Sequence, residues 1–157
     1  MNVVKSALLA MLATGALIAI PATAGNCKKI HADLSEIQST QGCNPGLASC
    51  FLGEVDGNHG LRGVTHFAAD SAVSTSPATS PNFLIYSGPF EYRTPGGNIT
   101  VRETGVTTRG SEGVVTAYQE IVSGTGEFAG ATGHFFVSGH KTGGTVETFV
   151  NGEICGI

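Results

Sequence analysis

Residues 122–133 read VSGTGEFAGATG, and the strand-like segment HFFVSG follows at residues 134–139. A strand that ends in this stretch must reverse its direction within a few residues. Gly124 and Gly126 are expected to supply the positive φ angles of such a tight turn, because glycine adopts them at little steric cost. Phe128 is expected to fold back into the core. The stretch therefore predicts a compact turn between two strands.

Gly130 and Gly133 are expected to let two backbones approach closely or to let a barrel wall bend. The same glycines bear a superficial likeness to a phosphate-binding loop. However, the spacing of Gly124, Gly126 and Gly130 is one residue longer than the dinucleotide fingerprint. Neither a Lys-Ser/Thr pair nor a helical pattern follows them. The stretch therefore argues against nucleotide binding.

The rest of the chain has the composition of an all-β protein. Val, Thr, Phe and Ile recur in short runs, glycine is frequent, and Trp is absent. Clusters of turn-forming residues separate these runs at regular intervals, at residues 41–46, 56–60, 74–82, 94–98, 109–113, 123–126 and 140–144. This pattern is typical of a β-sandwich or β-barrel. Residues 71–82 predict a long surface loop.

Period-2 alternation marks individual strands along the chain. Within residues 84–92, Tyr86, Phe90 and Tyr92 share one face of the predicted strand. Residues 30–37 fit either a helix or a strand broken by one bulge. We expect a strand there, because helix caps are missing and turn residues follow.

A second alternating face is a candidate lining for a partly polar cavity. Within residues 114–122, Thr116, Tyr118 and Glu120 share one side of the predicted strand. If that side points inward, burial would raise the pKa of Glu120 and make it a candidate acid or base. If that side points outward, Glu120 is a surface charge, as acidic side chains mostly are. Glu120 is the catalytic candidate of the sequence, and both orientations stay open.

The N-terminus has the pattern of a secretory signal peptide. Lys5 precedes an apolar run at residues 7–20, and the small-residue triplet Ala22-Thr23-Ala24 follows. The run is shorter than the roughly 20 residues that a membrane-spanning helix needs. We therefore expect a signal peptide over residues 1–24 and one soluble domain over residues 25–157. The expected location is secreted or periplasmic.

The four cysteines all lie after the predicted cleavage site, at Cys27, Cys43, Cys50 and Cys155. In an oxidising compartment an even number of cysteines indicates disulfides. Four cysteines can form two bridges in three ways, and we expect the bridges Cys43–Cys50 and Cys27–Cys155. The first would close a short loop. The second would tie the first strand to the last and contribute roughly 4–5 kcal/mol by the chain-entropy model.

The charge pattern argues against several partners. The formal net charge is −4, and the basic residues are scattered singly apart from Lys28-Lys29. We therefore expect neither nucleic acid nor a membrane surface as a partner. No serine lies in a G-x-S-x-G elbow. Asn98 begins a glycosylation acceptor triplet, which matters only in a eukaryotic secretory route.

The histidines do not converge on a metal site. His134 and His140 share strand parity but would lie about 20 Å apart along an extended strand, so they cannot hold one ion together. His59 and His66 have opposite parity. We expect these side chains to be solvated or satisfied in the core, and we predict no metal and no cofactor.

The glycine turn also carries a family resemblance. Residues 124–133 resemble the GTGxFxGAxG turn of allene oxide cyclase and dirigent-like barrels, and of bacterial secreted proteins with an allene oxide cyclase barrel-like domain. Residues 84–88, 94–99 and 150–155 resemble other segments of those bacterial proteins. The resemblance implies an eight-stranded antiparallel barrel with an internal cavity. Plant members of the family cyclise a fatty-acid epoxide or steer radical coupling of phenols, and none of their catalytic residues can be placed on this chain.

The leading hypothesis is an antiparallel β-barrel with two disulfides that binds a small apolar or aromatic molecule in its lumen. Its candidate ligand-binding residues are Tyr86, Tyr92, Arg102 and Tyr118. Core packing is the alternative role for the aromatic residues. A second hypothesis is a cyclase or isomerase, and a third is a structural or surface-interaction barrel. An open, partly polar lumen separates the first two from the third, and a buried Glu or Arg inside it favours an enzyme.

Overall fold

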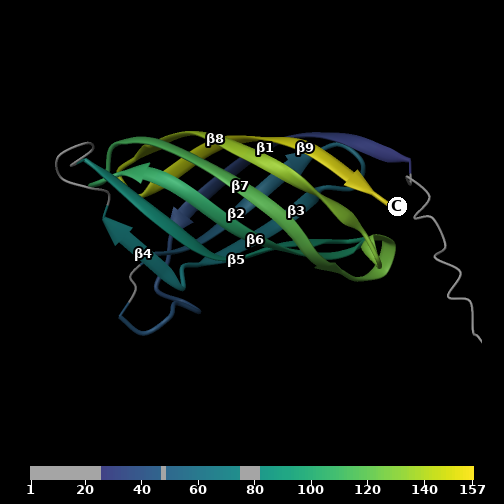
Figure 1. Ribbon diagram of the computed structural model, residues 1–157, viewed down its shortest axis with the longest axis horizontal. Coiled ribbons are helices and arrows are strands. Elements are labelled where there is room, and N and C mark those ends of the chain that lie inside the picture. Colours follow the sequence, from purple (N-terminus) through teal and green to yellow (C-terminus); the bar gives the residue numbers. More distant parts are fainter. Residues whose placement is uncertain (1–25, 47–48, 75–81) are drawn as a thin grey trace, which may run out of the picture.

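The computed structural model describes residues 26–46, 49–74 and 82–157. The predicted signal peptide lies outside these residues. The described chain forms a nine-stranded sheet and a short 3-10 helix (Figure 1). The elements are β1 (Cys27–Gln38), β2 (Cys50–Gly57), β3 (Arg62–Ala68), β4 (Ser71–Ser74), β5 (Phe83–Thr94), β6 (Gly97–Thr108), β7 (Gly113–Gly124), η1 (Gly126–Phe128), β8 (Thr132–Thr142) and β9 (Thr145–Cys155).

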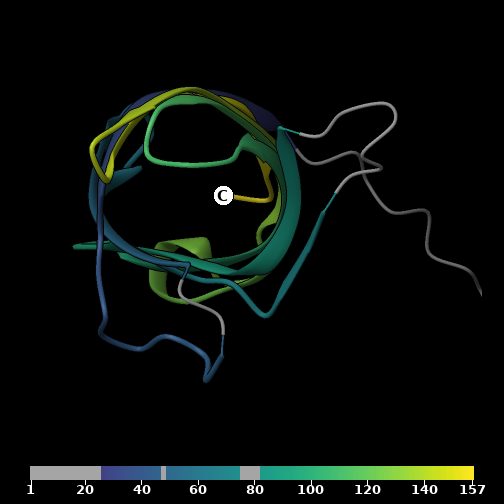
Figure 2. The same ribbon diagram turned by 90° about the vertical axis from the view of Figure 1, so that its left-hand side faces the viewer.

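The sheet closes into an antiparallel barrel. Neighbouring strands pair in the order β3, β2, β1, β9, β8, β7, β6, β5, and β3 pairs back onto β5 to complete the ring. Figure 2 shows this ring from one end. The predicted all-β, eight-stranded antiparallel barrel is therefore confirmed, and β4 is one extra strand that also pairs with β5.

The extra strand β4 continues the line of β3 along the same partner. Phe67 of β3 pairs with Phe90 of β5, and Ser71 of β4 pairs with Ser87 of β5. The segment from Phe67 to Ser71 is therefore one residue longer than the segment of β5 that it faces. One unmatched residue in an antiparallel pair is a β-bulge, which bends the strand. The prediction of a loop over residues 71–82 is wrong at residues 71–74, where β4 forms, and residues 75–81 of that loop lie outside the described residues.

The ambiguous segment at residues 30–37 lies within β1 and is a strand, as predicted. Its pairing with β2 and β9 runs in one register without a bulge. Ile30, Ala32 and Leu34 are buried in the lumen, and the residues between them are exposed. Strict alternation of this kind is the mark of a strand with one face toward a core.

The glycine turn closes one end of the barrel. Phe128 of η1 is only 1% exposed and belongs to the same core cluster as Leu61, from the turn between β2 and β3. Gly126 has a φ angle of 60°, as predicted. Gly124 does not have a positive φ angle, contrary to the prediction. Glycine is required there for a different reason, because a Cβ atom would lie 2.0 Å from the carbonyl oxygen of Phe128.

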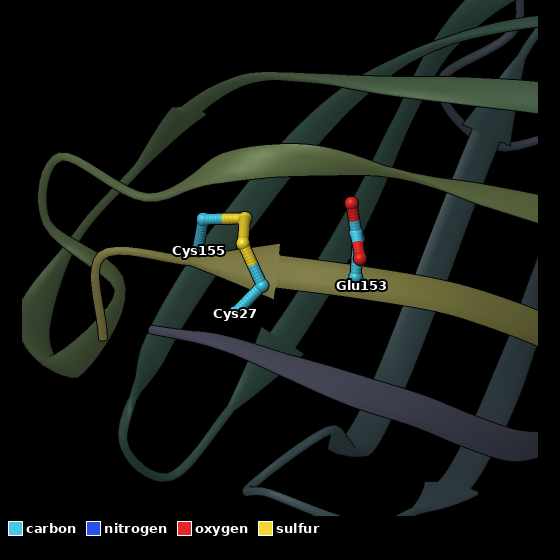
Figure 3. A group of neighbouring side chains, drawn as sticks. All are labelled: Cys27, Glu153 and Cys155. Carbon is cyan, nitrogen blue, oxygen red and sulfur yellow. A yellow bond between two sulfur atoms is a disulfide. The ribbon is translucent and has the colours of Figure 1, made fainter. Parts of the chain in front are cut away.

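A disulfide joins the first and last strands at this closed end. Cys27 of β1 lies opposite Cys155 of β9 in the strand register, and the two are bonded (Figure 3). This bridge confirms one of the two predicted disulfides. Cys43 and Cys50 are neighbours whose side chains interact, but they are not bonded to each other. The structure therefore holds one disulfide and one nearby pair of thiols.

Candidate functional site

A cavity of about 600 Å³ opens at the end of the barrel opposite the disulfide. Its mouth lies where β6 and β8 end and where β7 and β9 begin, at the end that faces the viewer in Figure 2. The surface of its wall is mostly apolar, and the apolar side chains that line it are Phe51, Phe67, Leu84, Val115 and Val146. A volume of this size lies within the range of small-molecule sites.

A carboxyl group and a phenol lie among these apolar walls. Glu36 and Tyr86 both line the cavity, and each is only 8% exposed. The Oε1 atom of Glu36 is buried and has no hydrogen-bond partner among the described residues. Burial, together with the nearby Glu103 carboxylate, raises the pKa of Glu36 well above its usual range. The raised pKa favours the protonated carboxyl, which can donate a hydrogen bond.

A hydrogen-bonded network continues from Tyr86 into the barrel. The hydroxyl of Tyr86 donates to Glu103, and the amide of Gln119 donates to the same carboxylate. The hydroxyl of Tyr92 donates to the carbonyl oxygen of Gln119 at 2.6 Å. All four residues are buried. Burial raises the pKa of Glu103, while its hydrogen bonds from Gln119 and Tyr86 act in the opposite direction.

Two basic residues lie near the mouth of the cavity. Lys141 is half-buried, and its ammonium group donates to the backbone carbonyl of Thr108. Burial lowers the pKa of Lys141. Arg109 lines the same cavity. The cavity therefore combines two basic side chains at its mouth with a buried carboxyl group, in a chain whose net charge is −4.

The structure divides the four predicted ligand-binding residues between two sides of the barrel wall. Tyr86 lines the cavity, and Tyr92 lies deeper in the lumen, within the buried network. Arg102 is exposed on the outside, where its guanidinium donates to Asp70 at 2.8 Å. Tyr118 is 42% exposed and stacks on His134 on the outer surface.

The proposed inward face of residues 114–122 is also on the outside. Glu120 is exposed and lies opposite Arg102 in the pairing of β7 with β6. Ala117, Gln119 and Ile121, the alternate residues of β7, fill the lumen instead. Of the two orientations that the sequence leaves open for Glu120, the structure has the outward one, so Glu120 is a surface charge rather than a cavity residue.

Among the buried polar residues of the barrel, sequence reasoning missed Glu36, Glu103 and Gln119. A signal for each was present in the period-2 pattern. Glu36 shares parity with Ile30 and Leu34, which are buried. Glu103 likewise shares parity with Ile99 and Val101, and Gln119 with Ala117 and Ile121. A polar residue in phase with a buried apolar face is therefore a candidate lumen residue.

A cluster of possible metal ligands lies at the closed end of the barrel. Cys27, Glu153 and Cys155 bring their ligand atoms within 4.8 Å of one another (Figure 3). However, both sulfurs belong to the disulfide, and a metal needs the free thiolate. The carboxylate of Glu153 binds the ammonium of Lys29 at 2.7 Å. This cluster is therefore a disulfide beside a surface ion pair, and its sulfurs cannot serve as thiolate ligands.

No protein-family model and no curated protein matches the chain. Within residues 26–46, 49–74 and 82–157, no helix has the length and apolar character that a membrane crossing requires. The cavity and the groups that line it are the features of the described residues that bear on function.

Proposed function

We propose that the protein binds a small apolar or aromatic molecule in the cavity at the open end of the barrel. The observation that carries this proposal is an apolar cavity of about 600 Å³ whose wall includes Glu36, a residue with one buried carboxyl oxygen that has no partner among the described residues. A buried polar atom without a partner costs free energy, so it marks a place where a bound molecule or water completes a hydrogen bond. A barrel with a purely structural role would gain stability if side chains filled this space.

The cavity lining defines the ligand that we propose. Phe51 and Phe67 offer aromatic surface to a ring or an unsaturated chain. The protonated carboxyl of Glu36 offers a hydrogen bond to an acceptor such as a carbonyl, ether or phenol oxygen. The ligand therefore combines an apolar body with one hydrogen-bond acceptor at its buried end.

A cyclase or isomerase is the second candidate function. A buried acid inside the lumen is the feature that favours an enzyme over a simple binding protein, and Glu36 is such an acid. It replaces Glu120 as the candidate acid. The proposed membership in the allene oxide cyclase-like group, based on the glycine turn, supports this candidate at the level of fold.

The dye 1-anilinonaphthalene-8-sulfonate tests the binding function, because it combines aromatic rings with a negative charge that suits the basic mouth. We expect saturable fluorescence enhancement by the folded protein. Val115→Trp, which places an indole in the cavity, should weaken binding at least tenfold, or about 1.4 kcal/mol. Val122→Trp is the matched control, because Val122 lies on the same strand but is exposed outside the barrel. Circular dichroism establishes that each variant is folded.

The two variants must behave differently if the lumen is the site. If Val115→Trp binds the dye as tightly as the wild type does, the dye lies on the outer surface. The same conclusion follows if Val122→Trp weakens binding as much as Val115→Trp does. Either result would remove the support for a lumen site. A folded protein that does not bind the dye at all would also contradict the proposal.

We propose that the protein is exported and that Cys43 and Cys50 form a second disulfide after export. The apolar N-terminal run supports export, and the Cys27–Cys155 bridge is compatible with an oxidising compartment. The thiol of Cys50 donates to the carbonyl of Gln41 at 2.9 Å and also interacts with Cys43, so little movement is needed for bonding. We expect the intact mass of the exported protein to lack four hydrogens. A loss of only two, with Cys43 and Cys50 alkylated by iodoacetamide, would contradict the second bridge.

A further inference from the structure

Lys141 is the one lysine of residues 26–157 that lies in the cavity wall. It occurs near the end of β8, in phase with the buried residues Phe135 and Val137, so its side chain points into the barrel rather than away from it. The other lysines of this part of the chain, Lys28 and Lys29, are exposed at the start of β1, at the opposite end of the barrel. Of these three lysines, Lys141 is therefore the one that a molecule in the cavity could contact.

The surroundings of Lys141 suit a nucleophilic amine. Val146 lies opposite Lys141 in the register of β8 with β9, and it contributes an apolar wall beside the stem of the lysine. The amino group binds the carbonyl of Thr108, which keeps it at the mouth of the cavity. The charged groups that line the same cavity are Glu36 and Arg109. Partial burial in this wall lowers the pKa of Lys141, so its amine loses a proton more readily than that of an exposed lysine, and the neutral amine is a nucleophile.

We propose that Lys141 captures an apolar aldehyde inside the cavity by forming a Schiff base with it. This inference rests on the proposed function, because the cavity must first hold the apolar part of the aldehyde. Binding there would place the carbonyl carbon beside the amine and raise the effective concentration of the two groups. The ligand class of the barrel would then include aromatic and long-chain aldehydes.

The capture step needs no external oxidant or reductant. The lone pair of the neutral Lys141 amine attacks the aldehyde carbon, a C–N bond forms as the π bond of the carbonyl breaks, and one proton moves from nitrogen to oxygen to give a carbinolamine. The nitrogen then gives its one remaining proton to the hydroxyl group, and the C–O bond breaks to release water as the C=N bond forms. One aldehyde and one amine thus yield one imine and one water.

Reductive trapping tests the inference on the full-length exported protein. The protein is incubated with 2-naphthaldehyde and sodium cyanoborohydride at neutral pH, and peptide mapping by mass spectrometry measures labelling at each amine. We expect Lys141 to be labelled at least tenfold faster than Lys28 or Lys29. The N-terminal amine is scored separately, because its ordinary pKa also permits reaction at neutral pH. Lys141→Arg should remove the fast labelling, and Val115→Trp should slow it at least tenfold.

Labelling of Lys141 at the rate of Lys28 and Lys29 would overturn the inference. Dye binding by the wild-type protein, measured in parallel, then shows which proposal has failed. If the dye still binds in the cavity, the binding function stands and the covalent step is wrong. If the dye does not bind either, both proposals fall together.

Discussion

Replacing both Cys27 and Cys155 by serine is expected to lower the free energy of unfolding by about 5 kcal/mol. The bridge spans a sequence separation of 128 residues, so it restricts the unfolded chain over almost the whole domain. It also holds the first and last strands of the barrel in register. Urea denaturation monitored by circular dichroism measures the loss.

The effect must be separated from that of the other two cysteines. The control is a variant in which Cys43 and Cys50 are both serine, measured with and without a reductant. In that background the reductant acts only on the Cys27–Cys155 bridge, and the loss of stability should match that of the Cys27→Ser/Cys155→Ser variant. An unchanged urea midpoint on reduction would show that the strand pairing alone holds the ends of the barrel together.

Raising the pH from 5 to 8 is expected to destabilise the barrel. Burial raises the pKa of both Glu36 and Glu103 above the usual value of 4.5. Between that value and the pKa in the folded state, the folded protein holds protons that the unfolded chain has lost. Stability is then greatest below the unfolded pKa and falls as the pH rises toward the folded pKa. The slope is about 1.4 kcal/mol per pH unit for each carboxyl that stays protonated in the folded state.

Glu36→Gln and Glu103→Gln test the assignment of this slope, because each keeps the shape of the side chain and removes its titration. Each variant should lose part of the dependence on pH, and the double variant should lose most of it. The ion-paired carboxylates Asp70 and Glu153 have lowered pKa values and lose their contribution only in acid, below this window. A double variant with the slope of the wild type would refute the role of the buried carboxyls.

The barrel could be predicted from the sequence because its local signals agree with one another. Period-2 runs such as residues 84–92, and the turns between them, predict antiparallel strands without any knowledge of distant contacts. The Cys27–Cys155 bridge follows from the position of its cysteines in the first and last strands. The bulge that separates β3 from β4 has no comparable signal, since it depends on how both pair with β5.

The site was harder to predict because its groups meet only when the barrel closes. Tyr92, Glu103 and Gln119 come from β5, β6 and β7, and no spacing along the chain shows that they form one network. Aromatic character also misleads in this fold. Tyr118 and Phe136 pack against each other on the outer surface, where an amphipathic strand would carry polar residues. A polar residue that alternates in phase with buried apolar residues is therefore better evidence for a lumen position than a neighbouring aromatic residue is.

The two ends of the barrel differ, because Phe128 fills the core at one end and the cavity opens at the other. Within the described residues, η1 and the disulfide occupy the end with Phe128, so an elongated guest bound as proposed would enter and depart through the opposite opening. Such a guest would keep the same terminus outward in every protein molecule. A bulky group attached to the outward terminus would be accommodated in solvent, whereas the same group on the inward terminus would exclude the guest. Selectivity would then depend on the position of a substituent as much as on its chemical nature.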